Sequence, residues 1–503
     1  MEKFFPHHRH PDYHMTGHEL HLRTINTTGR NGMLSAYMST TWMVIATLCT
    51  GVGAEAAPPG PAKEQEPWLT AARQVVEPLI EEEIMAISIG LIDNDRKLSL
   101  HFGKLSRTST TIPNDDTIYE IGSITKTFTA LLLADLVVRQ ELRLEEDIIQ
   151  YLPEGEPVPM CADHPVRWVD LATHTSGLPR LPGNLLIKDP LNPYKGYTVE
   201  MLEKAVADHA RLSNLRRGLY SLGRTQAPEY HYSNFGFGLL GHLLAKHTGK
   251  SYEQLLIERI TEPLAMHDTR VTLTAEQQSR LAPGHNADLD PVPGWEMDAM
   301  VGTGGVRSTI RDMLRYAEAN LRSQPTPLDG AVTLTHQPRV PFPNGKVGLG
   351  WHISEGIWHN GMTGGYASFL WLEPDEHRAV VVLANAASPY VDAVGLALKD
   401  CLRGRPPRPV PRRPVYHVPP AVLDSYVGQY QLLLSRLVIS RDQRSLRARL
   451  GNQPALRIYP ASDREFFYKM VDARITFDCD ECGNVKGLTL HQNGLKLYFT
   501  RRP

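Results

Sequence analysis

The sequence has few cysteines, and their spacing does not suggest a structural framework. Five cysteines among 503 residues are too few for a disulfide scaffold, and Cys49, Cys161 and Cys401 are isolated. Cys479 and Cys482 form a C-x-x-C pair, but a zinc site needs a second pair and a thioredoxin-like motif needs a βαβ setting. We therefore expect two incidental thiols on a turn, or a local disulfide if the compartment is oxidising.

An excess of charge of one sign is also missing. The chain carries 53 basic and 55 acidic residues, which gives a formal net charge of −2. Bulk electrostatics therefore favour neither nucleic acid nor an anionic membrane surface, and we expect no nucleic-acid partner. A local cluster of arginines in residues 403–413 is interrupted by prolines, so we interpret it as part of a solvated linker.

The apolar run near the N-terminus is too short for a transmembrane helix. Residues 41–54 form this short run, and the A-x-A cleavage pattern Ala54-Glu-Ala56 follows it. We interpret residues 1–56 as an N-terminal extension with an export signal, which predicts a periplasmic or secreted protein without an integral membrane span. The histidine-rich residues 1–32 are either a metal-binding tail or, in the interpretation we favour, sequence upstream of a true start at Met33.

The composition that remains is ordinary for a globular protein, with 42% apolar and 21% charged residues over a length suited to two or more domains. Residues 65–402 form the larger predicted domain. Residues 403–420 contain seven prolines and five arginines, which is typical of a semi-rigid linker. In residues 421–503, seven short alternating strands separated by turns predict a small antiparallel β-barrel or sandwich.

The larger domain is predicted to be α/β, an antiparallel sheet with helices packed on it. It opens with a helix and a strand hairpin, at residues 68–83, 86–93 and 98–102. It closes with strands at residues 348–353, 365–372 and 379–383. Because strands at both ends enclose a long helical middle, we expect the terminal segments to share one sheet. Residues 180–200 are expected to form a loop over the site, and Gly302–Gly305 a tight turn.

The first chemical motif is Ser123-Ile-Thr-Lys126, the only S-x-x-K in the chain. A helix that begins near Ser123 places Ser123 and Lys126 one turn apart on the same face. It also leaves the serine at the helix N-terminus, where free N–H groups favour a developing negative charge. The apolar residues that follow make a surface helix with a stray lysine a poor interpretation, since an interior lysine needs a reason to be there. Burial would lower its pKa and let it accept the serine proton.

Two further motifs follow along the chain. Tyr232-Ser-Asn234 is the only Y-x-N; in isolation we would interpret it as a loop tyrosine with an Asn helix cap, but the S-x-x-K motif favours a catalytic role. Tyr232 would shuttle a proton, and Asn234 would bond the lysine and a substrate carbonyl. His359-Asn-Gly361 is a weak H-x-G pattern, distinguished by glycines that allow close backbone approach. The N–H groups of Met362 and Ser123 would then form an oxyanion hole.

In this order the three motifs resemble those of the penicillin-recognising serine hydrolases. That group is peptidase S12-like and comprises class C β-lactamases, D-alanyl-D-alanine carboxypeptidases and family VIII esterases. Supporting stretches are Leu171–Pro179, Gly302–Gly305 with Ser308-Thr309, and Gly348–Trp351. The resemblance covers about residues 65–402. It implies a β-lactamase/transpeptidase-like α+β fold, in which helices flank an antiparallel sheet and an all-α subdomain is present. The C-terminal β-domain is similar to accessory domains of some of these relatives.

The resemblance also implies the role of each residue. Ser123 would be the acylated nucleophile, Lys126 and Tyr232 would handle its proton, and Asn234 would position the substrate. Which of Lys126 and Tyr232 is the formal base stays open. The substrate would be a small molecule or peptide: a β-lactam, a D-alanyl peptide or an ester. No metal or other cofactor is expected.

One position departs from the family pattern. β-Lactamases of this group usually carry Lys-Thr-Gly at the third motif, and here His359 stands in place of the lysine. A permanent cation would grip a substrate carboxylate, whereas a neutral histidine grips it less well near pH 7. This favours D-amino-acid peptides or esters, with slow lactam hydrolysis. A penicillin-binding sensor that acylates without efficient turnover is the alternative function, and the intact motifs count against a degenerate scaffold.

Overall fold

The computed structural model describes residues 67–220, 229–410, 414–433, 435–442, 445–451, 455–469, 473–492 and 495–502. The predictions for residues 1–56 (the histidine-rich segment, the export signal and its cleavage site) lie outside these residues. Among the residues that the structure describes, no helix combines the length and hydrophobicity needed to cross a bilayer.

The larger domain is organised around one antiparallel sheet of eight strands, in the order β2-β1-β14-β13-β12-β11-β10-β9. The strands are β1 (Ala86–Asp93), β2 (Arg96–Gly103), β9 (Val340–Phe342), β10 (Gly345–Val347), β11 (His352–Ser354), β12 (Gly356–Met362), β13 (Ala367–Glu373) and β14 (Arg378–Ala384). Because β1 pairs with β14, with Ile89 opposite Val382, the two ends of the domain share one sheet, as predicted.

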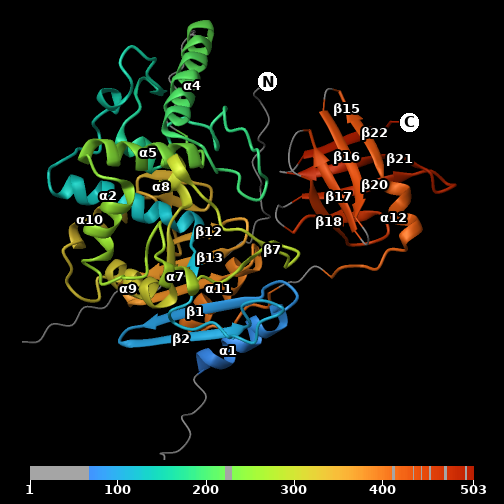
Figure 1. Cartoon of the computed structure of the whole chain (residues 1–503), viewed down its shortest axis with the longest axis horizontal. Coiled ribbons are helices and arrows are strands. Elements are labelled where there is room, and N and C mark those ends of the chain that lie inside the picture. The colour runs from blue at the N-terminus through green and yellow to red at the C-terminus, as the bar shows by residue number, and fades with distance from the viewer. Residues whose placement is uncertain are drawn as a thin grey trace, which may run out of the picture. The chain divides into compact units, whose positions relative to one another are not determined.

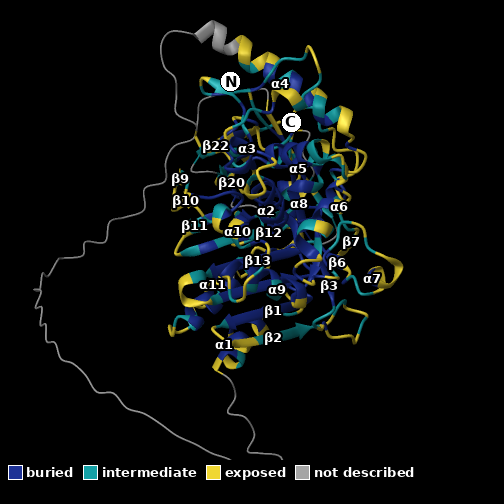
Figure 2. Cartoon of the chain, turned by 90° about the vertical axis from the view of Figure 1, so that its left-hand side faces the viewer, coloured by how far each residue is buried: buried dark blue, intermediate teal, exposed yellow. Residues whose placement is uncertain are grey.

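Helices cover both faces of this sheet, so its central strands are apolar on both sides (Figure 2). Successive strand residues point to opposite faces, and β13 shows this clearly. Phe369 and Trp371 pack with helices α1 (Pro67–Val76) and α11 (Tyr390–Leu402). Leu370 belongs to the larger core on the other face, which includes most of the domain's helices.

The helical part follows the sheet's first hairpin in the chain (Figure 1). Its elements are α2 (Thr125–Val138), α3 (Trp168–Ala172), α4 (Val199–Tyr220), α5 (Asn234–Thr248), α6 (Tyr252–Leu256), α7 (Ala275–Ser279), α8 (Val301–Gly304), α9 (Ile310–Leu321) and α10 (Asp329–Thr335). α2 is buried along nearly its whole length because every side of it contacts other elements, including α5, α8 and α10. Together the sheet, its flanking helices and this helical part confirm the predicted fold class.

Three local predictions differ from the structure. The helix expected over residues 68–83 ends at Val76, because Pro78 enters the short 3₁₀ turn η1 (Glu77–Leu79) and Glu81 adopts a positive φ of 66°. Gly302–Gly305 is not a simple turn, since residues 301–304 form the short helix α8. The strand expected at residues 348–353 begins only at His352, where β11 starts. The expected loop over residues 180–200, in contrast, is present up to Val199, where the long helix α4 begins.

The C-terminal part is a closed antiparallel barrel, which decides between the predicted barrel and sandwich. Its strands are β15 (Gly428–Leu432), β16 (Ser435–Asp442), β17 (Ser445–Leu450), β18 (Leu456–Pro460), β19 (Glu465–Phe467), β20 (Ala473–Cys479), β21 (Val485–Gln492) and β22 (Leu495–Arg501), preceded by helix α12 (Pro420–Tyr426). The sequence predicted seven of these eight strands and missed β19, which is only 3 residues long. The barrel has its own apolar core, built around Tyr430, Phe466 and Phe477.

Candidate active site

Ser123 lies in a sharp turn that leads directly into α2. The turn is the 3₁₀ segment η2 (Gly122–Ile124), and Gly122 adopts a positive φ of 49°. A Cβ on Gly122 would lie 2.7 Å from the backbone nitrogen of Met362, so the turn can approach β12 only because residue 122 is glycine. The serine therefore stands at the N-terminal end of α2 and beside the end of β12.

Lys126 is completely buried one turn further along, as predicted. Its Nζ lies 3.0 Å from Ser123 Oγ and donates to the backbone oxygen of Thr303 at 2.8 Å. Burial holds the pKa of Lys126 well below its usual value, and the positive charge of Arg180 lowers it further. A neutral amine at hydrogen-bond distance from a serine hydroxyl is able to accept its proton.

Tyr232 completes a compact group with these two residues. The Lys126 Nζ lies 4.9 Å from the centre of the Tyr232 ring, and Ser123 is a hydrogen-bond partner of the tyrosine hydroxyl. Burial raises the pKa of Tyr232 to about 12. The phenol therefore keeps its proton at neutral pH and is able to pass it to a neighbouring group. The structure thus brings together Ser123, Lys126 and Tyr232.

His174 supports Tyr232 from behind, a role that the sequence did not indicate. The two rings stack, with their centroids 4.5 Å apart. Its Nδ1 accepts a bond from the backbone N–H of Ser233 at 3.0 Å, so the proton of the neutral ring is assigned to Nε2. Burial keeps the pKa of His174 well below its usual value. The available sequence signal for His174 was that it lies within Leu171–Pro179, one of the stretches that resemble the family.

Asn234 is the first residue of α5 and differs from its prediction in one contact. Its side-chain nitrogen donates to the Tyr194 hydroxyl at 3.4 Å, and its Oδ1 is buried without a hydrogen-bond partner. The expected bond to Lys126 is therefore wrong, because the lysine bonds Ser123 and Thr303 instead. The unpaired oxygen leaves the Asn234 amide with an acceptor for a substrate N–H.

His359 lies on β12 with its side chain buried toward the site. Its Nδ1 is 2.6 Å from the backbone oxygen of Asn360, and its Nε2 is buried without a partner. Burial holds the pKa of His359 well below its usual value, and the nearby His352 and Lys126 lower it further. The imidazole is therefore neutral near pH 7, as the sequence predicted for this position.

Gly361 and Met362 bring the end of β12 against the nucleophile. A Cβ on Gly361 would lie 2.1 Å from the backbone oxygen of Ile121 and 2.9 Å from the backbone nitrogen of Ser123. Only glycine permits this approach, which also brings the Met362 N–H close to the Ser123 turn. The backbone nitrogens of Ser123 and Met362, from two different elements, thus lie close to this junction, and an oxyanion hole needs two such donors near the nucleophile.

His352 is a second buried histidine that the sequence did not single out. Its ring centroid is 5.2 Å from that of His359, and its Nδ1 has no hydrogen-bond partner. Burial lowers the pKa of His352 to about 4. The stretch Gly348–Trp351, which resembles the family, ends one residue before His352. Only the folded sheet, which places His352 beside His359, indicates a role for it.

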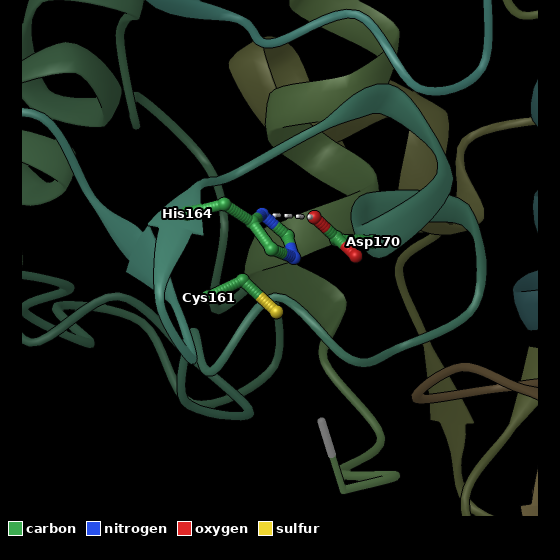
Figure 3. A group of neighbouring side chains, drawn as sticks. All are labelled: Cys161, His164 and Asp170. Carbon is green, nitrogen blue, oxygen red and sulfur yellow. Dashed lines mark ion pairs between the residues drawn. The ribbon is translucent and has the colours of Figure 1, made fainter. Parts of the chain in front are cut away.

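Among the described residues, one group of side chains has the composition of a metal site (Figure 3). Cys161, predicted to be isolated, lies beside His164 and Asp170, with their ligand atoms within 4.8 Å of one another. Each already bonds the protein: Cys161 Sγ donates to Thr175 O, His164 Nδ1 lies 2.8 Å from Pro165 O, and Asp170 accepts from the Arg167 N–H. These bonds tie together the hairpin formed by β4 (Met160–Cys161) and β5 (His164–Pro165), helix α3, and the loop that carries His174.

Comparison with known proteins agrees with this geometry. The family described as Beta-lactamase matches residues 72–400, and a domain of unknown function, DUF3471, matches residues 412–501. The D-alanyl-D-alanine-carboxypeptidase/endopeptidase AmpH of Escherichia coli K12 is 29% identical over 321 residues, which is 59% of this chain and 79% of that protein. A beta-lactamase of Pseudomonas fluorescens is 25% identical over 376 residues, which is 65% of this chain and 97% of the relative.

A solved structure shares the fold. The class C beta lactamase of Rhodobacter sphaeroides aligns with a TM-score of 0.55 at 24% identity, over 67% of this chain and 99% of that one. The shared fold and the family match together define the class of this protein. The chain belongs to the Beta-lactamase family. Relatives in this family are hydrolases.

Proposed function

We propose that this protein is a serine hydrolase that cleaves amide or ester bonds through an acyl-enzyme on Ser123. The observation that carries the proposal is the distance of 3.0 Å between Ser123 Oγ and Lys126 Nζ, with the lysine completely buried. A buried lysine with no carboxylate partner among the described residues costs stability, and a catalytic role gives the reason for retaining it.

In the acylation step, Ser123 Oγ attacks the substrate carbonyl carbon and its proton passes to the group formed by Lys126 and Tyr232. The negative charge that develops on the carbonyl oxygen is stabilised by the N–H groups of Ser123 and Met362. When the tetrahedral intermediate collapses, the bond to the leaving group breaks and that group takes a proton from Tyr232. A water molecule then attacks the carbonyl carbon of the acyl-enzyme through the same steps. This releases the acid and regenerates the Ser123 hydroxyl.

The third motif favours peptides and esters over β-lactams. His359 is neutral at pH 7, and its one ring proton lies on Nδ1, which donates to the Asn360 carbonyl. Its free Nε2 is therefore an acceptor and offers a substrate carboxylate neither a charge nor a hydrogen bond. A carboxypeptidase/endopeptidase relative supports D-alanyl peptides as substrates, and the β-lactamase relatives support lactam hydrolysis as a slower activity. We therefore propose D-amino-acid peptides and esters as the preferred substrates.

A time course separates the hydrolase from an acylating sensor. Wild type and Ser123→Ala are incubated with a chromogenic cephalosporin, a p-nitrophenyl ester and a peptide ending in D-Ala-D-Ala. The proposal predicts steady turnover of the ester or peptide that disappears in Ser123→Ala. A burst of one equivalent without further product would identify the sensor instead. Undiminished turnover in Ser123→Ala would contradict both functions.

We also propose that the protein is exported. The support is the short apolar run of residues 41–54 followed by Ala54-Glu-Ala56. N-terminal sequencing of the protein produced in a bacterial host tests this. A mature N-terminus at Ala57 in the periplasm or medium is expected, and an uncleaved chain in the cytoplasm would contradict it.

A further inference from the structure

Arg180 places a positive charge at an exposed position beside the candidate active site. Its guanidinium carbon lies 5.2 Å from the centre of the Tyr232 ring, and the residue is exposed. Its backbone is held in place, since its carbonyl oxygen accepts bonds from the N–H groups of Asn234 and Phe235 at 3.0 and 3.2 Å. The backbone of Arg180 is thus held at the start of α5, and its guanidinium lies over the ring of Tyr232.

The guanidinium of Arg180 has no anionic partner among the described residues. Among the residues that the structure describes, no carboxylate forms an ion pair with Arg180, and its guanidinium lies over the face of the Tyr232 ring. A ring face attracts the cation but does not accept the five N–H groups that lie in the guanidinium plane. Those donors therefore remain available to a ligand that enters the site.

The other basic groups of the site do not supply this charge. Burial lowers the pKa of four basic groups, Lys126, His174, His352 and His359. Each therefore binds a proton less readily than it does in water. An arginine side chain is a permanent cation in proteins, and the positive charge of Arg180 acts on Lys126, His174 and Tyr232. Among these basic groups, Arg180 is therefore the one that can bind a negatively charged substrate group at neutral pH.

We propose that Arg180 binds a carboxylate of the substrate and so selects anionic acyl substrates, supplying the cation that His359 does not. The proposal rests on the proposed serine hydrolase function and assigns its substrate class: peptides or esters that carry a free carboxylate. The guanidinium matches a carboxylate in shape and can form two parallel N–H···O bonds with it. This contact would orient the substrate across Tyr232, with its scissile carbonyl over Ser123.

Matched substrate pairs test the proposal. One pair is p-nitrophenyl acetate and the mono-p-nitrophenyl ester of glutaric acid; the other is a peptide ending in D-Ala-D-Ala and its C-terminal amide. For each pair, kcat/KM of the anionic member is divided by that of the neutral member. Wild type is compared with Arg180→Gln, Arg180→Lys and the control Arg143→Gln, an exposed arginine of the same domain. Circular dichroism checks that each variant is folded.

We expect Arg180→Gln to lower this ratio about tenfold for at least one pair, while the neutral substrates change about twofold or less. Arg180→Lys should keep part of the preference, because it keeps the charge but loses the two-bond geometry. Arg143→Gln should keep the wild-type ratio. Raising the salt concentration should reduce the wild-type ratio toward that of Arg180→Gln, since the guanidinium is exposed.

Two outcomes would overturn the proposal. If Arg180→Gln has the wild-type ratio of kcat/KM between anionic and neutral substrates, residue 180 does not bind the substrate charge. An equal loss for anionic and neutral substrates would mean that Arg180 only supports the Tyr232 ring. Either result, with turnover still dependent on Ser123, leaves the serine hydrolase function intact. Hydrolysis that persists in Ser123→Ala would instead refute the function on which the proposal rests.

Discussion

At the scale of single residues, Lys126 is the side chain that best indicates the chemistry of the site. The sequence indicated its burial because α2 is apolar on most sides, and the structure places it fully inside. Its neighbour Ser123 is only three residues away on the same helical turn, so this pair was predictable from local geometry alone. Arg180 and His352 were not predictable in this way, because only the folded chain brings residues so distant in sequence near Lys126.

Replacing the lysine should stabilise the protein while abolishing activity. The pKa of Lys126 in the fold lies well below that of the unfolded chain, so between these two pKa values folding is coupled to the loss of a proton from the amine. This cost grows by about 1.4 kcal/mol per pH unit below the unfolded pKa, down to the folded pKa. Lys126→Met should therefore be more stable than wild type at pH 7, by a margin that shrinks as the pH rises toward 10.

Urea unfolding of Lys126→Met and wild type at pH 6, 7.5 and 9 measures this margin. A difference in unfolding free energy that does not change with pH would contradict the assignment of a neutral buried lysine. Hydrolysis by Lys126→Met at the wild-type rate would show that the amine is not part of the proton pathway.

The buried histidines should make the fold sensitive to mild acid. His352 has a folded pKa of about 4 against 6.5 in the unfolded chain, so the unfolded state binds more protons between these values. The stability contribution is therefore complete above pH 6.5 and is lost as the pH falls toward 4, at about 1.4 kcal/mol per pH unit. His174 and His359 add to this loss in the same direction.

His352→Gln should make this acid-induced loss of stability less steep, by about one proton in the slope of unfolding free energy against pH. Urea midpoints at pH 7.5, 6 and 5 give that slope. The control is His267→Gln, an exposed histidine, which should leave the slope unchanged. Equal slopes for wild type and His352→Gln would contradict the neutral state assigned to His352.

At the scale of elements, the site is built where a helix start meets a strand end. The S-x-x-K motif predicted the helix start and the glycines of 361–365 predicted the close approach, because each leaves a local sequence signal. Other elements left none. β19 has only 3 residues, and helix α4 has little hydrophobic periodicity, so neither has a clear pattern. Strands β9 and β10 are equally short and join the sheet through β11, which coincides only with the end of the strand predicted at residues 348–353.

Gly361→Ala tests the contact between helix start and strand. The added Cβ would meet the backbone oxygen of Ile121 at 2.1 Å, so either β12 or the Ser123 turn must shift. We expect a loss of at least about a hundredfold in kcat/KM and a destabilisation of about 1–3 kcal/mol. The matched control is Gly183→Ala, where a Cβ would meet nothing within 4 Å. Wild-type activity in Gly361→Ala would contradict an oxyanion site at this junction.

At the scale of the whole molecule, the hydrophobic cores divide the chain. Two core clusters lie on the two faces of the eight-stranded sheet, and a third consists entirely of residues from Val418 to Phe499. The change from helical to short alternating patterns predicted a separate β-domain. Closure into a barrel was not predictable, because a sandwich presents the same alternation of buried and exposed residues.

The barrel should therefore fold as an isolated fragment. A fragment of residues 414–503 retains the whole third core cluster and all eight strands of the closed sheet, so no edge strand is left unpaired. We expect a cooperative thermal transition and dispersed amide signals in its NMR spectrum. A spectrum typical of an unfolded chain would show that the barrel depends on residues before 414.

An acyl group on Ser123 is the most direct test of the proposed chemistry. The protein is mixed with benzylpenicillin or a p-nitrophenyl ester, quenched in acid within milliseconds to seconds, and analysed by intact mass and peptide mapping. We predict a mass increase equal to one acyl group, located on the peptide that contains Ser123 and absent from Ser123→Ala. Substrate turnover with an adduct on another residue, or the same adduct on Ser123→Ala, would contradict an acyl-enzyme at this serine.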